Sequence, residues 1–285
     1  MILVTGATSK VGSELVPLLW QRGASVRALV HTARNTDWPG VDVVSADLTD
    51  PITLDDAVEG VENIYLISPP APGELHLRME RNVIDAAARA RVRRVVKQSV
   101  LDADADRPVG IMRSHHACEL YLKASGLPFT ILRPNSFMQD LLLFAPSIRT
   151  ERAFRAPAEG VRLSMIDARD VAAVAAVVLT APGHEGTTYE LTGPEAVSFD
   201  QAADVLTEVL GEPVSYIPVS NDDARAALRA MGTPAFVVEE AIAHFDFWRT
   251  GAGARVTETV RDHTGRKPRS LAGFAVDQFR ALIRT

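Results

Sequence analysis

Two glycines near the start of the chain are spaced for binding phosphate groups. Gly6 and Gly12 bracket the loop GATSKVG, which lies between an apolar run and an amphipathic segment. Glycine permits a tight turn here, and a helix that begins in this loop offers unpaired amides and a positive dipole to phosphate. Where the backbone approaches a pyrophosphate most closely the chain has Ser9 instead of the expected glycine. The loop predicts a dinucleotide site, and the alternative is a turn of the same kind that binds no ligand.

The segments around this loop predict the structure that supports it. Residues 2–5 and 25–30 are predicted to be buried strands, and residues 10–22, closed by Gly23, the helix between them. Strand, loop, helix and strand in this order form the dinucleotide-binding unit of doubly wound sheets. The alternation continues, with strands predicted at 41–46, 63–67, 94–99 and 128–132 and helices at 53–58, 74–91 and 110–125.

The residues after the second strand bear on the choice between NAD and NADP. NAD-selective proteins usually place a carboxylate about 20 residues beyond the glycines, where it binds the ribose 2′-hydroxyl. This chain has His31 at that place, with Arg34 close by. Cations without an acid favour a 2′-phosphate, so we expect NADP (NADPH), with NAD possible. The alternative is that His31 merely ends a strand.

Two further strand ends carry candidate binding residues. Asp47 and Leu48 end the third strand and are placed to flank an adenine, with the carboxylate reaching its exocyclic amine. The fourth strand runs into a loop that begins Ser68-Pro69-Pro70 and that its prolines stiffen. Open α/β sheets bind ligands outside the carboxyl ends of their strands, so we expect this loop at the site as well.

Beyond residue 135 the regular alternation ends. The stripe 136–144, which includes Phe137 and Met138, suits a lid or pocket wall and equally suits plain core. Later segments predict strands at 162–166, 189–191 and 214–218, helices at 170–180 and 198–210, and a largely helical remainder.

Composition excludes several classes of function. A chain of 285 residues that is 47% hydrophobic buries a substantial core. Its formal net charge is −6 and its arginines are scattered, which argues against nucleic acid as a partner. The single cysteine, Cys118, permits no intrachain disulfide and fits a reducing cytoplasm. No apolar run approaches the roughly 20 residues of a membrane span, and the first strand leaves no room for a signal peptide. We expect a cytoplasmic monomer or homodimer with no membrane partner.

Several segments together resemble one known family. They are GATSKVG, ADLTD, SPPAPGE, LKASGLPFTILRPNSFMQ, IDARDVAAVA, YELTGPEAVSF and TGRKPRS. In this order they resemble the NmrA-like branch of the atypical short-chain dehydrogenase/reductases, which includes NAD(P)H:quinone and azo-dye reductases and redox-sensing regulators. The resemblance spans essentially the whole chain. It implies an α/β fold with a Rossmann-type doubly wound parallel sheet in residues 1–135, completed by about 162–182. A smaller α+β substrate-binding domain would occupy most of 136–285.

The resemblance also implies a set of cofactor-binding residues. They are Gly6, Thr8, Ser9, Lys10, Val11 and Gly12 for the pyrophosphate, His31 where many relatives have arginine for the 2′-phosphate, Asp47 and Leu48 beside the adenine, Ser68 and Pro69 over the nicotinamide ribose, Gln98 and Ser99 at the end of the fifth strand, and Pro134 and Asn135 under the nicotinamide.

The sequence departs from the wider superfamily in the active-site helix. Reductases there carry a Tyr-x-x-x-Lys pair, in which lysine lowers the tyrosine pKa and tyrosine protonates the carbonyl oxygen. Counting back from Gly126 places the tyrosine position at Ile111 and the lysine position at His115. None of the four tyrosines has a lysine four residues later. The residues at that spacing from Tyr65, Tyr121, Tyr189 and Tyr216 are Pro69, Ser125, Gly193 and Ser220.

His115 is the candidate catalytic residue, as the titratable side chain expected near the nicotinamide. Glu119, one helical turn on, is expected to hold its ring and raise its pKa. The alternatives are that His115 binds ribose or packs, and that Glu119 serves the helix surface. No metal is expected, because His115 and His116 point apart and no third ligand is evident. Cys118 lacks the cationic setting of a nucleophile.

The missing tyrosine narrows the expected acceptors. Hydride transfer to a ketone leaves a strongly basic alkoxide, whereas transfer to a quinone leaves a phenolate whose conjugate acid has a pKa of about 10. A general acid typically contributes roughly 10²–10⁴ in rate, which a quinone largely does without. We therefore expect an NAD(P)H-dependent oxidoreductase of small quinone-like aromatic or other conjugated, electron-poor acceptors. Two alternatives stay open: a non-catalytic redox-sensing regulator, and a tailoring reductase or isomerase of aromatic natural-product biosynthesis.

Overall fold

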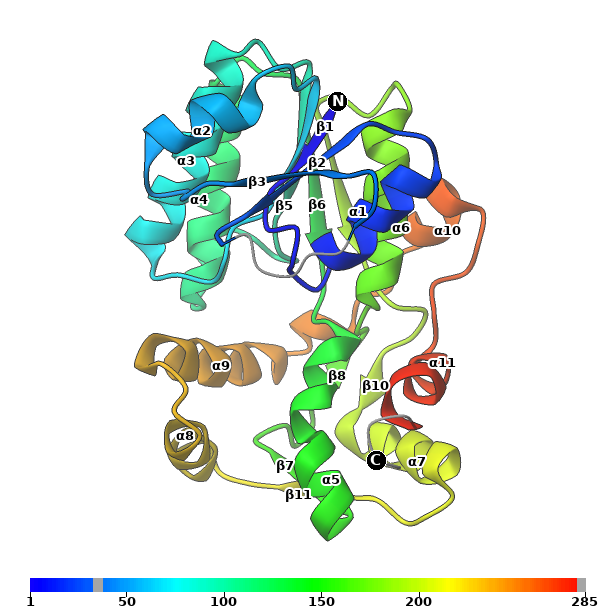
Figure 1. Cartoon of the computed structure of the whole chain (residues 1–285). Helices are drawn as coiled ribbons and strands as arrows, with labels where there is room; N and C mark the ends of the chain where they lie inside the picture. The colour runs from blue at the N-terminus through cyan, green and yellow to red at the C-terminus, as the bar shows by residue number, and fades with distance from the viewer. Residues whose placement is uncertain (33–37, 281–285) are drawn as a thin grey trace. The chain divides into compact units, whose positions relative to one another are not determined.

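Seven parallel strands form the central sheet of the computed structural model, which describes residues 1–32 and 38–280 (Figure 1). Their order is β3-β2-β1-β4-β5-β6-β9. The strands are β1 (Ile2–Val4), β2 (Val26–Val30), β3 (Asp42–Ser45), β4 (Asn63–Leu66), β5 (Arg94–Gln98), β6 (Phe129–Pro134) and β9 (Thr187–Leu191). Every neighbouring pair is parallel. The predicted Rossmann-type doubly wound sheet is confirmed.

Helices cover both faces of this sheet, as Figure 1 shows. On one face α1 (Gly12–Gln21) packs beside α6 (Ala168–Thr180). On the other face α3 (Gly73–Arg89) packs between α2 (Pro51–Val58) and α4 (Gly110–Ala124). Parallel strands between two helical layers are buried on both sides, so their residues are mostly apolar. All three residues of β1 are buried accordingly.

The chain divides into two compact units. The first consists of Met1–Pro134, Ala168–Leu191 and Asp262–Gly265 and contains the seven-stranded sheet. The second consists of Asn135–Asp167, Thr192–Arg261 and the described residues from Arg266 onward. None of the helices in the described ranges is long and apolar enough to cross a membrane.

The second unit is built from short strands and helices. Its strands are β7 (Ala153–Ala156), paired in parallel with β11 (Ser215–Pro218), and β8 (Arg162–Leu163), antiparallel to β10 (Val197–Ser198). Its longer helices are α5 (Ala145–Glu151), α7 (Phe199–Leu210), α8 (Asn221–Ala230) and α9 (Ala235–Trp248). The sequence prediction missed α5, β7 and β10, which are too short to show a clear hydrophobic period.

The apolar stripe after residue 135 belongs mainly to the core of the second unit. It forms a 3₁₀ helix, η1 (Met138–Phe144), whose Met138 and Leu141 are 2% and 3% exposed and belong to one core cluster with Phe154. Phe137 is half-buried and pairs with Ile166 through a β-bridge. For Met138, predicted as a pocket residue, the structure therefore supports the alternative of plain core, while Phe137 stays a candidate for contact with substrate.

Candidate functional site

The glycine loop has a backbone path that side chains would block. Gly6 has a φ of +55°, and a Cβ there would lie 2.8 Å from Cγ2 of Ile67. At Gly12 a Cβ would lie 2.3 Å from the carbonyl oxygen of Gly6 and 2.9 Å from Cα of Ala7. Gly12 is thus required by the loop's own backbone. The loop retains the shape of a pyrophosphate cradle at the start of α1.

Ser9, which replaces the expected glycine, takes part in closing the loop. Its amide donates to the carbonyl of Gly6 at 2.8 Å, and its Oγ accepts from the amide of Gly12 at 3.0 Å. The side chains of Thr8 and Lys10 are exposed, whereas Val11 is buried. Serine therefore supplies a bond inside the turn that glycine could not.

The end of β1 is tied to the end of β4. Oγ1 of Thr5 donates to the carbonyl of Ile67 at 2.7 Å and accepts from its amide at 2.8 Å. Because β1 lies between β2 and β4, the sheet reverses its order here, and open α/β sheets bind ligands at such a switch point. The predicted loops at Gly6 and at Ser68 thus leave the same edge of the sheet from neighbouring strands.

The predicted adenine side lies at the end of β3. Oδ1 of Asp47 accepts from the amide and hydroxyl of Thr49, both at 2.8 Å, and these bonds lower the pKa of Asp47, with a smaller contribution from His31. Leu48 is 7% exposed, and its carbonyl accepts from Asn82 on α3 at 2.9 Å. His31 is exposed just after β2. Arg34 lies outside the described residues, so its predicted role stays a prediction.

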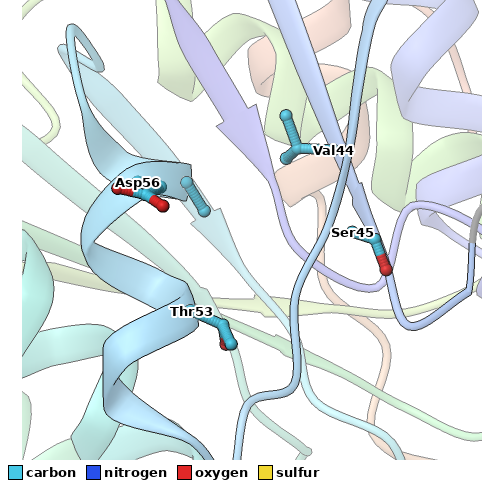
Figure 2. A pocket seen from close by; sticks show the side chains of 5 residues that line it. Val44, Ser45, Thr53 and Asp56 are labelled. Atoms are coloured by element: carbon cyan, nitrogen blue, oxygen red, sulfur yellow. The ribbon is translucent and has the colours of Figure 1, made fainter.

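A hollow of about 380 Å³ opens between β3 and α2. Figure 2 shows Val44 and Ser45 of the strand on one side and Thr53 and Asp56 of the helix on the other, and Ala57 completes the lining. None of the predicted cofactor-binding residues lines this hollow. We assign it no part in the site.

Glu119 does not hold the ring of His115, and that expectation is wrong. Its carboxylate accepts from Ser99 Oγ at 2.6 Å and from Arg133 Nε and Nη2 at 2.9 and 2.6 Å, with Lys123 Nζ 3.7 Å away. Glu119 is fully buried, so its charge needs cations, and it has Arg133 from β6 and Lys123 from its own helix. It fastens α4 to the sheet, and Ser99, predicted to bind cofactor, is its 1% exposed partner.

A different group holds His115. Lys97 on β5 is paired with the carboxylate of Glu80 on α3, and both side chains are 0% exposed. The Lys97 Nζ also lies 3.2 Å from Nδ1 of His115 on α4 and 3.3 Å from the carbonyl of Gln98. The ring of His76 packs against that of His115 with centroids 4.5 Å apart. We call Glu80, Lys97, His76 and His115 the buried cluster.

Glu80 is the anion of the buried cluster. Besides Lys97, its carboxylate has Nε2 of His76 at 3.3 Å and accepts from Ser68 Oγ at 3.2 Å. Burial alone would raise the pKa of Glu80, but the Lys97 charge and the His76 hydrogen bond outweigh burial and lower that pKa below its usual range. The predicted ribose loop, at Ser68, and the predicted catalytic histidine are therefore joined through one ion pair.

His115 is neutral in this setting. Burial, then the charges of Lys97 and His76, lower its pKa well below the ordinary value, and the Glu80 carboxylate opposes this only in part. The direction is opposite to the one expected from Glu119. At neutral pH His115 is an imidazole that accepts through one nitrogen and donates through the other.

The cluster also bears on the expectation of no metal. One ligand atom from each of His76, Glu80 and His115 lies within 4.8 Å of the others, so a third potential ligand exists that the sequence did not reveal. The Lys97 ammonium already contacts two of the three. The ammonium group of Lys97 thus provides positive charge among these three side chains. Burial raises the pKa of the neighbouring Cys118, which keeps the thiol protonated and a poor nucleophile.

The remaining predicted residues have mainly structural partners. Gln98 Oε1 accepts from the buried hydroxyl of Tyr65 at 2.7 Å, and the carbonyl of Pro134 accepts from Leu101 at 2.9 Å. Asn135 is 5% exposed; its amide donates to Ser164 Oγ at 2.8 Å and to the Gly253 carbonyl at 2.9 Å. Pro69 is exposed on its loop.

Three residues of the buried cluster were missed from the sequence, although two signals pointed to them. Lys97 follows Val95 and Val96 in a central strand, where a charged side chain is rarely buried unless it is paired. His76 and Glu80 stand four residues apart on a helix face whose neighbours Met79 and Val83 are apolar. Neither signal alone identifies the partner on another element.

Known proteins share this architecture and much of the sequence. Residues 1–271 match the NmrA-like family. The chain is 36% identical to an NAD(P)H azoreductase of Xenophilus azovorans, with 96% of each chain covered. It is 37% identical to (4-alkanoyl-5-oxo-2,5-dihydrofuran-3-yl)methyl phosphate reductase of Streptomyces griseus, with 99% of each covered.

A solved structure extends the similarity to three dimensions. The NADPH-dependent quinone oxidoreductase of Escherichia coli, crystallised with NADPH, superposes with a TM-score of 0.88 at 31% identity, over 98% of this chain and 100% of that one. The sheet order, the glycine loop and these similarities agree. The chain belongs to the NmrA-like family.

Proposed function

We propose that this protein uses NADPH to reduce quinone-like and other conjugated, electron-poor acceptors, and that it does so without a proton-donating side chain. The observation that carries the proposal is His115, a neutral imidazole with a lowered pKa in the helix where the wider superfamily has its Tyr-x-x-x-Lys pair.

The general activity is that of an NAD(P)H-dependent oxidoreductase, in keeping with the family and with relatives named as azoreductase and quinone oxidoreductase. The glycine loop fits the cofactor, because the absence of a Cβ at Gly6 and Gly12 is a requirement of its backbone path. Gly6 to Gly12 would hold the pyrophosphate, Asp47 and Leu48 the adenine side, and His31 with Arg34 the 2′-phosphate. When bound, the nicotinamide supplies hydride.

The residues near the expected nicotinamide suit only some acceptors. A neutral imidazole donates a hydrogen bond from N–H but gives up that proton reluctantly, so His115 stabilises a developing oxyanion instead of neutralising it. Around His115, Glu80 is ionised, Lys97 is paired with the Glu80 carboxylate, and Nε2 of His76 lies 3.3 Å from that same carboxylate. An acceptor whose reduced oxygen is a weak base therefore reacts, and one that leaves an alkoxide does not.

Two relatives have acceptors of this kind in their names. A quinone becomes a phenolate, with a conjugate-acid pKa of about 10. The furanone of the Streptomyces griseus relative has a ring double bond conjugated to two carbonyl groups. We further propose that the first unit binds the cofactor and that the second, through residues such as half-buried Phe137, contacts a small aromatic substrate.

The test is oxidation of NADPH by the full chain, followed at the absorbance band of the cofactor with para-benzoquinones and, separately, simple ketones. We expect turnover with quinones and almost none with ketones. Calorimetry with NADP⁺ and NADPH accompanies it. No turnover with any acceptor, combined with clear discrimination between the two cofactor forms, would replace the proposal with the redox-sensing alternative.

A further inference from the structure

We propose that Lys97 is a positioning residue that fixes His115 as the tautomer with its proton on Nε2, and so makes it a hydrogen-bond donor to the acceptor's oxygen. The tautomer follows from the contacts of Nδ1 and the charges around it, and its use in catalysis rests on the proposed function.

Lys97 has as many N–H donors as it has acceptor neighbours. An ammonium group has three N–H donors and no lone pair. Its neighbours are a carboxylate oxygen of Glu80, the carbonyl oxygen of Gln98 and Nδ1 of His115, which are three acceptors for three donors. Nδ1 must therefore accept, because a proton there would face the N–H groups of Lys97. A neutral His115 then carries its proton on Nε2.

Glu80 fixes the position of Lys97. The side chain is 0% exposed and paired with a carboxylate that is ionised, since a lowered pKa keeps Glu80 charged at neutral pH. Ser68 and His76 occupy further positions on that carboxylate. Glu80 thus holds Lys97 in place, and Lys97 holds Nδ1 of His115.

The other ring nitrogen of His115, Nε2, is the one left for an acceptor molecule. His115 is half-buried, and no hydrogen-bond partner of its Nε2 exists among the described residues. The proton left on that nitrogen is available to an acceptor molecule. The nearest ionisable groups are Glu80, Lys97 and His76, and the last two disfavour an imidazolium. His115 is thereby kept a donor of a hydrogen bond and not of a proton.

This arrangement sets the range of acceptors. A hydrogen bond to a developing charge stabilises it without transferring a proton, so the reduced oxygen leaves the site as an anion and takes its proton from water. In the wider superfamily the lysine lies one turn after the acid on the same helix. Here it comes from β5, and the group that it orients is an imidazole.

Nitrogen NMR of the full chain labelled in histidine tests the tautomer directly. The His115 signals are assigned by their loss in His115→Gln. We expect one neutral form with the proton on Nε2, unchanged across about pH 5.5–7.5, where an ordinary histidine titrates. In Lys97→Met/Glu80→Gln both tautomers should appear and titration should return. A proton on Nδ1, or an imidazolium, in the unmodified protein would overturn the inference.

Kinetics test the positioning role. Lys97→Met alone leaves the Glu80 carboxylate buried without its cation and is prone to misfold, so the double variant Lys97→Met/Glu80→Gln, which removes both charges, is compared with the unmodified protein. We expect the double change to lower kcat with a quinone about tenfold, with the KM for NADPH nearly unchanged.

The same change in a His115→Ala background should have almost no effect, because the residue through which Lys97 acts is gone. An equal loss of kcat in both backgrounds would make Lys97 merely structural. If no variant, including the unmodified protein, turns over quinone, the proposed function fails while the NMR result still decides the tautomer.

Discussion

The glycine loop and the buried cluster lie in the same unit but are built on opposite principles. The loop is one contiguous segment whose shape comes from backbone, and its requirement is that two side chains be absent. The buried cluster is made of side chains from α3, β5 and α4, and its requirement is that charges balance. An added side chain should therefore disrupt the glycine loop, whereas removal of one charged partner should disrupt the buried cluster.

Loss of charge balance should produce the largest effect. Lys97→Met leaves the Glu80 carboxylate buried without its cation, which costs about 3–5 kcal/mol of unfolding free energy for such pairs. Chemical denaturation measures it. The matched control is Arg89→Met, which removes half of a surface pair with Asp55 whose side chains are 52% and 57% exposed and should cost at most about 1 kcal/mol. Equal costs for the two variants would contradict the contrast.

A side chain added to the glycine loop should have the next largest effect. Gly12→Ala should abolish NADPH binding in calorimetry while the fold persists, because even one methyl group meets the backbone of Gly6 at 2.3 Å. Gly73→Ala is the control, since a Cβ at that helix start meets nothing within 4 Å. Retention of full affinity in Gly12→Ala would show that the loop does not hold the cofactor.

Loss of the residues expected to bind the 2′-phosphate of the cofactor should have a smaller effect. If His31 and Arg34 together receive it, replacing both with alanine should raise KM for NADPH by about tenfold to hundredfold, the value of a charge-assisted hydrogen bond. KM for NADH should change little. Equal increases for the two cofactors would mean that the pair does not read the phosphate.

The smallest effect is the dependence of stability on pH. A folded-state pKa of His115 below its unfolded value of about 6.5 gives stability that is complete above pH 6.5 and is lost as the pH falls. Between pH 7.5 and 5.5 this histidine should account for at most about 1.4 kcal/mol. His115→Gln should flatten that part of the profile in denaturation experiments. An unchanged slope would place the titration elsewhere, such as at His244, whose pKa burial also lowers.

The two regions also differ in how far the sequence predicted them. Hydrophobic runs predicted the individual strands and glycine spacing predicted the loop, because each signal lies within a short stretch of the chain. Glu119 was wrongly paired with His115 since the four-residue spacing on a helix ignores Arg133, which lies closer to the carboxylate in space. Lys97, Glu80 and His76 needed the pairing of β5 with its neighbours and the packing of α3 against α4 before they met.

We propose that His115 donates a hydrogen bond and no proton, so the basicity of the reduced product governs the rate. The direct measurement is kcat/KM for a series of quinones and activated carbonyl compounds, with the unmodified chain and with His115→Ala. We predict that rates fall as the reduced product becomes a stronger base, and that the loss caused by His115→Ala grows along the same series. A uniform loss across all acceptors, or preferred turnover of simple ketones by the unmodified chain, would contradict the account.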